Sequence, residues 1–221
     1  SDETLIFTAG FNSEDWSGEL KAHRVQDYKT SYAGCEAGSK LQFKVNRNLF
    51  TTKIDYIPGD TTQHTTEGVI LDFGQLSASQ QTALNASDDL GAERISWLEN
   101  TSTYSSFRDL EGKVLGDIVS SNPALVRQRY QGFSRLIDAP SFRNSPSVIY
   151  VGSNGGMLHA FKADCDNNDC SKINVSCGGL FDELFAFVPG ELLSETKDST
   201  TAPINALMEI TSRPELVFVR G

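Results

Sequence analysis

The chain has 221 residues and a formal net charge of −10 at pH 7, with 19 basic and 29 acidic side chains. Binding to nucleic acid or to an anionic membrane surface needs clustered Lys and Arg, so this charge balance disfavours both functions. No apolar run approaches the ~20 residues that cross a bilayer as a helix. The 13 Phe, 6 Tyr and 18 Gly residues favour strands and tight turns over a helical bundle.

The first predicted element is a β-hairpin at the start of the chain. LIFTAG, residues 5–10, has strand chemistry, and WSGELKAH, residues 16–23, follows after a polar loop. We expect Trp16 to pack into the core, as aromatic side chains near such turns do. Because the sequence begins directly in strand-like residues, we expect an excised domain or a mature fragment.

The middle of the chain predicts further strands and one helical insertion. LQFKVNR, residues 41–47, alternates apolar and polar positions as a half-buried strand does. Residues 68–73 and 116–126 are further strand candidates. Ser77 to Gln80 has the spacing of a helix capping box, and a second short helix is expected over residues 91–98. The helical insertion is therefore predicted to span approximately residues 77–98.

A second hairpin is predicted in VIYVGSNGGMLHAF, residues 148–161, with its turn at Asn154-Gly155. Residues 156–161 repeat the pattern of residues 18–23, and a third copy of the strand begins at residues 215–221. Repeated hairpins indicate the blades of a β-propeller, which hold about 40–50 residues each. The predicted fold is all-β: an incomplete β-propeller that forms one domain over residues 1–221.

The glycines of this second hairpin are also compatible with a phosphate-binding loop, in which His159 would be a catalytic base. A dinucleotide-binding loop needs G-x-G-x-x-G at the start of a helix, whereas Gly152, Gly155 and Gly156 precede a strand-like run. Strand alternation places Leu158 and Ala160 on one face and His159 on the other. We therefore predict a hairpin, a strand-surface or inter-blade position for His159, and no catalytic residue.

The four cysteines favour disulfides over zinc. Cys35, Cys165, Cys170 and Cys177 lack the C-x₂-C spacing of a zinc site. Disulfides imply an oxidising compartment. Three pairings are open, and we prefer Cys165–Cys170 with Cys35–Cys177.

The acidic loop ADCDNNDC, residues 163–170, is a candidate calcium site. Its oxygen donors are Asp164, Asp166, Asn168 and Asp169, and Ca²⁺ prefers six to eight such ligands. The loop is not an EF-hand, because Asp169 stands where the glycine should be and Val175 where the bidentate Glu should be. A solvated acidic loop without metal is the alternative.

Four blocks of the sequence resemble the PilY/PilC-type proteins of bacterial type IV pili. The blocks occur in the same order as in that family and together span nearly the whole chain. They are DWSGELKAHRV at residues 15–25, FRDLEGKVLGDIVSSNPALV at residues 107–126, VIYVGSNGGMLHAF at residues 148–161, and ELFAFVPGELL at residues 183–193. Two acidic positions of the family are absent: Gly155 replaces the Asp of Asn-Asp-Gly, and Arg220 replaces the Asp of a later Val-Asp-Gly.

The resemblance implies a seven-bladed modified propeller that is exported to the bacterial cell surface and placed at the pilus tip. It implies roles in pilus assembly, adhesion and twitching motility, with minor pilins and a host-cell or abiotic surface as partners. It also raises the expectation of bound Ca²⁺. The loops that break the strand pattern, residues 14–33, 50–68, 127–142 and 162–182, are the expected contact regions. The alternative is a fragment of a periplasmic dehydrogenase that uses pyrroloquinoline quinone.

Overall fold

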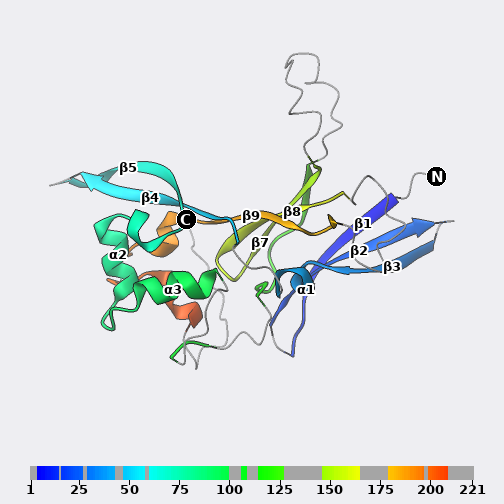
Figure 1. Ribbon diagram of the computed structural model, residues 1–221, viewed down its shortest axis with the longest axis horizontal. Helices are drawn as coiled ribbons and strands as arrows, with labels where there is room; N and C mark the ends of the chain where they lie inside the picture. Colours follow the sequence, from blue (N-terminus) through cyan, green and yellow to red (C-terminus); the bar gives the residue numbers. More distant parts are fainter. Residues whose placement is uncertain are drawn as a thin grey trace, which may run out of the picture.

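A computed structural model shows mostly strands, arranged in two open sheets with a short helical region beside the larger sheet (Figure 1). The structure describes residues 4–14, 16–26, 29–42, 47–57, 60–99, 106–108, 114–126, 146–164, 179–196 and 199–208. Within these ranges, no helix is long and apolar enough to cross a membrane.

The smaller sheet is an antiparallel meander of three strands. Its members are β1 (Thr4–Phe11), β2 (Gly18–Gln26) and β3 (Lys29–Glu36), in that order across the sheet. The first predicted hairpin is thereby confirmed. The short helix α1 (Ala37–Gln42) follows β3. The strand predicted to start at Leu41 is wrong there, because the helical turn packs Leu41 into the core beside Ala37.

The larger sheet has six strands in the order β5-β4-β9-β8-β7-β6. Their bounds are Leu49–Ile57 for β4, Asp60–Ile70 for β5, Ala124–Val126 for β6, Val148–Ser153 for β7, Met157–Lys162 for β8 and Glu183–Val188 for β9. From β6 to β9 each strand pairs antiparallel with the next one along the chain. The β4–β5 hairpin extends this sheet, because β4 pairs parallel with β9.

The predicted helical segment is confirmed as α2 (Ala78–Asn85) and α3 (Gly91–Leu98). The Ser77 hydroxyl accepts the Gln80 backbone N–H, which completes the predicted capping box. The buried Gln80 side chain also donates to the carbonyls of Thr52 in β4 and Gly190 in the 3₁₀ helix η5 (Gly190–Leu193). The capping residue therefore also fixes the helices to the sheet, whose β4–β5 end they cover (Figure 1).

Two hydrophobic cores hold these parts together. The first lies between the larger sheet and the helical region, and it includes the 3₁₀ helix η6 (Pro203–Met208). The second joins the two sheets, and it combines Leu20 and Ala22 of β2 with Ile149, Val151 and Phe161 of the β7–β8 hairpin. Each large side chain buried there contributes about 1.5–3 kcal/mol relative to an exposed one. The strands of both predicted hairpins therefore share a core.

The fold-class prediction is confirmed only in part. Strands dominate as expected, but the helices make the described chain mixed rather than all-β, and its sheets stay open without forming a propeller. In the described chain, the parallel pairing of Leu49 to Thr51 with Ala186 to Val188 joins the β4–β5 hairpin and the β6–β9 meander into one wide sheet. The third strand copy, residues 215–221, lies outside the described residues.

The expected contact loops are largely strands. Most of residues 50–68 form the β4–β5 hairpin, and residues 18–26 within the region 14–33 form β2. The region 127–142 and most of 162–182 lie outside the described residues. Residues 50–68 were misread because Thr, Lys and Asp on an exposed hairpin mimic a loop in composition, although β-branched residues also favour strands.

Candidate functional site

The glycine-rich stretch that suggested either a phosphate loop or a hairpin is a hairpin. β7 and β8 pair in register from Val148 with Lys162 to Ser153 with Met157. The turn is closed by the Gly156 N–H, which donates to the Ser153 carbonyl at 3.1 Å. Gly156 has φ of +78°, a conformation that glycine adopts without steric cost. No helix starts after these glycines, so the hairpin prediction is confirmed.

The turn packs against the segment of residues 114–118. The Asn154 backbone N–H donates to the Asp117 carbonyl at 2.9 Å, and the Asn154 side-chain amide donates to the Asp117 carboxylate at 2.6 Å. The Gly18 N–H donates to the Leu115 carbonyl at 2.8 Å. The backbones approach so closely that a Cβ on Gly116 would lie 2.3 Å from the Gly155 nitrogen. Gly18, Gly116 and Gly155 therefore lie in close backbone contact where the ends of the two hairpins meet, and we call these three residues the glycine junction.

Gly155 itself tolerates a side chain better than Gly116 does. A Cβ there would meet the Ser153 hydroxyl at 3.3 Å and the Gly116 Cα at 3.5 Å. The backbone could therefore accommodate the acidic residue of the resembling family after a small shift of Ser153. Its absence here leaves the hairpin intact, because Asn154 supplies the contacts to Asp117.

His159 lies on the inner face of the hairpin and is only 1% exposed. The predicted alternation is correct, since Leu158 points to the opposite face and is 40% exposed. Of the two predicted positions for His159, the strand surface is wrong, and the inter-blade position stays a prediction. Alternation assigns residues to two faces, but it does not say which face the rest of the protein covers.

A buried ionic cluster surrounds His159. Its Nδ1 lies 2.9 Å from Oε1 of Glu183, the first residue of β9. Arg47 holds the same carboxylate with two hydrogen bonds, from Nε to Oε2 and from Nη2 to Oε1, both at 2.8 Å. Arg47 Nη1 also donates to the Leu98 carbonyl at the end of α3. The Arg47 and Glu183 side chains have no exposed surface.

The surroundings set the protonation of this cluster. Burial alone raises the pKa of Glu183, but the hydrogen bonds from Arg47 and His159 and their charges outweigh it and lower the pKa to about 2. Burial lowers the pKa of His159, against the opposing effect of Glu183. Glu183 is therefore ionised and His159 neutral at pH 7. An ionised carboxylate only accepts hydrogen bonds, so the proton of His159 is assigned to Nδ1.

The other ring nitrogen of His159 faces Ser153. The Ser153 Oγ lies 3.1 Å from Nε2, which carries no proton in this tautomer and accepts the hydroxyl hydrogen. Ser153 is half-buried at the end of β7. A continuous line of hydrogen bonds therefore runs from Ser153 through His159 to Glu183 and Arg47; we call these four residues the relay.

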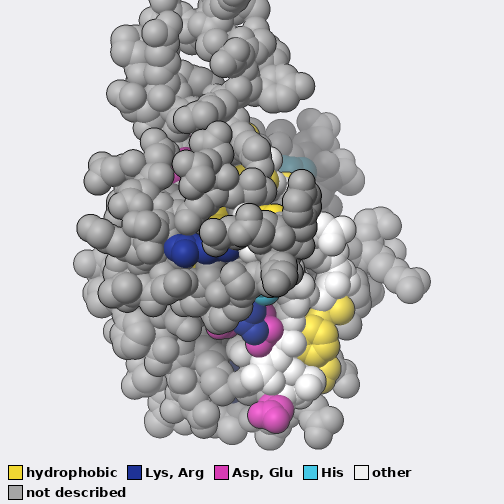
Figure 2. All heavy atoms as spheres, turned by 90° about the vertical axis from the view of Figure 1, so that its right-hand side faces the viewer, with side chains coloured by type: hydrophobic (Ala, Val, Ile, Leu, Met, Phe, Trp, Pro, Cys, Tyr) yellow, Lys and Arg dark blue, Asp and Glu magenta, His cyan; other side chains and the backbone are white. Residues whose placement is uncertain are grey.

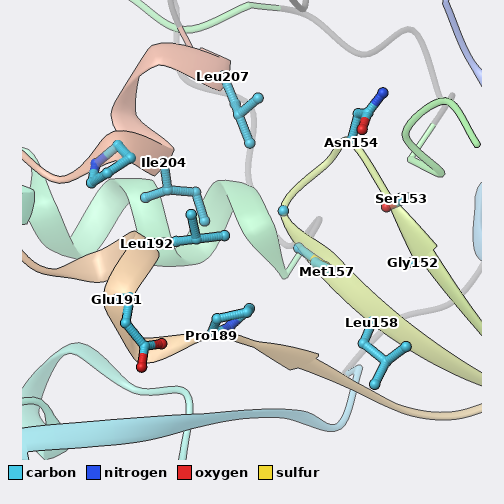
Figure 3. A pocket seen from close by; sticks show the side chains of 12 residues that line it. Gly152, Ser153, Asn154, Met157, Leu158, Pro189, Glu191, Leu192, Ile204 and Leu207 are labelled. Carbon is cyan, nitrogen blue, oxygen red and sulfur yellow. The ribbon is translucent and has the colours of Figure 1, made fainter. Parts of the chain in front are cut away.

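An apolar pocket of about 430 Å³ lies beside the end of the relay, between the β7–β8 turn and the η5–η6 segment (Figure 3). We call it the turn pocket. It is lined by Gly152, Ser153, Asn154, Gly156, Met157, Leu158, Pro189, Glu191, Leu192, Pro203, Ile204 and Leu207. Leu192, Ile204 and Leu207 face Met157 and Asn154 across it (Figure 3). Glu191 is the one carboxylate among these residues.

The predicted calcium ligands are mostly outside the described residues. Only Asp164 is described, and its Oδ2 accepts the backbone N–H of Ser147. One oxygen of Asp164 therefore closes the base of the hairpin. The described ranges contain no group of three or more His, Cys, Asp and Glu side chains that could hold a metal ion. The set that includes Asp166, Asn168 and Asp169 stays a prediction.

Cys35 is fully buried in the core between the sheets and is disulfide-bonded. Cys165, Cys170 and Cys177 lie outside the described residues. The preferred pairing of Cys35 with Cys177 and of Cys165 with Cys170 stays a prediction.

Trp16 is not a core residue, contrary to the prediction. It is 39% exposed, has φ of 59°, and stacks on Phe11 with ring centroids 5.4 Å apart. Its backbone N–H donates to the Asn12 carbonyl, which fixes the loop between β1 and β2. Figure 2, which views the right-hand side of Figure 1, shows a hydrophobic patch with acidic side chains near it.

Sequence reasoning missed Arg47 and Glu183. Arg47 and Glu183 are 136 residues apart, so no local pattern connects them. The one available signal is Glu183 itself, an acid that opens the otherwise apolar strand ELFAFV. A carboxylate in a buried strand needs a partner that neutralises its charge, but the sequence does not show which residue that partner is.

Comparison with known proteins finds similarity to a type IV pilus biogenesis factor from several strains of one bacterium. Over 197 residues the chain is 26% identical to the type IV pilus biogenesis factor PilY1 of Pseudomonas aeruginosa strain UCBPP-PA14, a match that covers 80% of this chain. It is 30% identical over 146 residues to PilY1 of strain PAO1, and 30% identical over 143 residues to PilY1 of strain PAK. No known family profile and no solved structure matches the chain.

The chain is thus a distant homologue of PilY1, and the resemblance inferred from the four blocks is confirmed at that level. It spans only 11–15% of the length of the curated relatives it matches. What is established is therefore a relationship to a small part of a pilus biogenesis factor.

Proposed function

We propose that the chain acts in type IV pilus biogenesis as a platform that makes protein–protein contacts at the pilus tip. The homology to PilY1 over 80% of the chain carries this proposal. The work of such a platform is positional: rigid sheets present loops to partner proteins. The shared core of the two sheets and the glycine junction supply the rigidity.

We further propose that strands β6 to β9 form one blade of a larger β-propeller. Their up-and-down antiparallel order is that of a four-stranded blade. On the outer face of this blade, Leu158 and Phe187 lie side by side in cross-strand register. The apolar row continues beyond the blade through Phe50 of β4 and Ile70 of β5. Ile70 is 64% exposed and Phe50 41%. Such a face is suited to packing against a neighbouring blade.

The proposed location is the bacterial cell surface, reached by export through the periplasm, with adhesion to host or abiotic surfaces and twitching motility as further roles. The partners are the minor pilins and the pilus tip complex. Homology to a pilus biogenesis factor supports this location, and the disulfide-bonded Cys35 is consistent with an oxidising compartment.

Binding to minor pilins tests the platform role. The immobilised 221-residue chain should retain purified minor pilins, and should not retain an unrelated acidic protein of similar size. Loss of binding at high salt alone would point to charge attraction, because exposed charges are screened there. Failure to retain any minor pilin of the same bacterium would contradict the proposal.

We also propose that the loop of residues 164–169 binds Ca²⁺ weakly. Calorimetric titration of the wild-type chain should show uptake at millimolar Ca²⁺, and Asp166→Ala should abolish it. The exposed Asp89 in the α2–α3 turn provides a matched control as Asp89→Asn. The absence of any heat signal for the wild type at millimolar Ca²⁺ would rule the site out.

A further inference from the structure

Ser153, His159 and Glu183 have the mutual geometry of a nucleophile, a general base and an orienting carboxylate. The hydroxyl lies 3.1 Å from one ring nitrogen of His159, and the carboxylate lies 2.9 Å from the other. Both distances are within hydrogen-bonding reach. Such constellations are recognised by geometry and roles, because they recur on unrelated folds in any chain order. The sequence suggested His159 as a candidate base but identified neither Ser153 nor Glu183 as its partner.

We propose that Ser153 is a nucleophile that attacks neutral carboxylic esters whose apolar acyl group occupies the turn pocket. This activity goes beyond the platform function, which requires no covalent chemistry. Ser153 lines the pocket while its hydroxyl is hydrogen-bonded to His159, so it stands where relay and pocket meet.

The relay is in the protonation state that this reaction needs. Glu183 is ionised and accepts the Nδ1 proton, so the Nε2 lone pair of the neutral imidazole accepts from Ser153. Arg47 does not touch Ser153. It acts as a positioning residue, because its two hydrogen bonds fix the orientation of the carboxylate. Orientation of the base by a fixed third group is what makes a serine hydroxyl reactive.

The reaction balances without a cofactor. As the Ser153 Oγ bonds to the carbonyl carbon, its proton moves to His159 Nε2 and the carbonyl oxygen becomes an oxyanion. The oxyanion then collapses, the ester C–O bond breaks, and the leaving alkoxide takes the proton from Nε2. Water attacks the acyl-serine in the same way and releases the acid. The net reaction converts one ester and one water to an acid and an alcohol.

The pocket walls define the substrate class. Met157, Leu192, Ile204 and Leu207 offer apolar surface for an acyl chain. Glu191 is exposed among the lining residues, and its charge would repel a negatively charged ester. We therefore expect neutral esters with unbranched acyl chains to react faster than acidic ones.

Covalent labelling tests the nucleophile. A fluorophosphonate probe should modify the 221-residue chain at Ser153, as identified by peptide mass spectrometry. Ser153→Ala should abolish the label. Because it leaves the buried Nε2 of His159 without its hydrogen bond, we expect a modest fall in the thermal midpoint, and circular dichroism should show that the variant is still folded. Ser87→Ala, a substitution of an exposed serine in the α2–α3 turn, should label like the wild type.

Hydrolysis of p-nitrophenyl esters gives the second readout. Ser153→Ala and His159→Gln should each lower kcat/KM by about 100-fold or more. Leu207→Trp, which fills the pocket, should slow the hexanoate ester more than the acetate. If a folded wild-type chain is neither labelled at Ser153 nor more active than Ser153→Ala, the relay is purely structural and the proposal is overturned. Equal effects of Leu207→Trp on both esters would refute the pocket as acyl site.

Discussion

Arg47 and Glu183 are the residues on which the buried cluster depends. Each is fully enclosed, and each would be left as an unpaired buried charge without the other. Removing one partner of such a pair costs far more than the net stabilisation that the pair provides. Arg47 binds both the Leu98 carbonyl at the end of α3 and Glu183 in β9. A substitution of Arg47 or Glu183 therefore weakens the contacts between residue 47, α3 and β9.

We predict that Glu183→Gln lowers the free energy of unfolding by about 3–5 kcal/mol, because it leaves Arg47 unpaired in the core. Urea denaturation followed by circular dichroism measures the change. Glu191→Gln removes an exposed carboxylate and should change stability by less than about 0.5 kcal/mol. Equal effects of the two substitutions would show that the buried pair is not formed.

His159 should make stability depend on pH. Burial lowers its pKa below the ordinary 6.5, so the unfolded chain takes up this proton as the pH falls through 6.5 while the folded protein does not. Stability should therefore fall between pH 7.5 and pH 5.5. Glu183, whose pKa is lowered to about 2, adds a further loss only below about pH 4.5.

The substitution His159→Gln isolates this effect. The difference in urea midpoint between pH 7.5 and pH 5.5 should be smaller for the variant than for the wild type. Groups outside the relay contribute equally to the pH dependence of both proteins. An identical pH dependence in the two proteins would mean that His159 is accessible to protons in the folded state.

At the scale of elements, the glycine junction decides how the two hairpins meet. Gly116 lies against the backbone of Gly155, and Gly18 lies against the carbonyl of Gly116. Backbone atoms cannot give way as a flexible side chain can. The segment that carries Gly116 therefore sets the spacing between the smaller and the larger sheet.

We predict that Gly116→Ala lowers the free energy of unfolding by at least about 2 kcal/mol, because its Cβ would overlap the Gly155 backbone. Gly10→Ala in β1 is the matched control, since a Cβ there meets no atom within 4 Å. It should leave stability unchanged or slightly raised. Chemical denaturation measures the free energy of unfolding of both variants. If Gly10→Ala lowers this free energy more than Gly116→Ala does, the close contact at Gly116 does not matter for stability.

The sequence predicts some elements better than others. The difference depends on whether the stabilising contacts join residues that are near or far apart along the chain. The capping box of Ser77 and Gln80 and the turn at Asn154-Gly155 are local, and both were predicted correctly. The parallel pairing of β4 with β9 and the partners of His159 join residues far apart along the chain. No periodicity or turn motif encodes such contacts, so the wide sheet and the relay were missed.

At the scale of the whole molecule, the chain combines a rigid two-sheet body with an exposed apolar sheet face and a homology to PilY1. Those features suit a piece of a larger assembly better than an isolated globule. The net charge of −10 disfavours self-association of the chain, and the neighbouring blade that we propose would cover the apolar row. The relay lies on the opposite face of β8 from this row, although Leu158 belongs to the row and also lines the turn pocket.

The pilus itself provides the most direct test of the central claim. Electron microscopy of the bacterium that encodes this chain should show far fewer surface pili after disruption of its gene, with piliation restored by a copy in trans. A copy carrying Gly116→Ala should restore piliation poorly, and one carrying Gly10→Ala should restore it fully. Normal piliation in the disrupted strain would contradict the account.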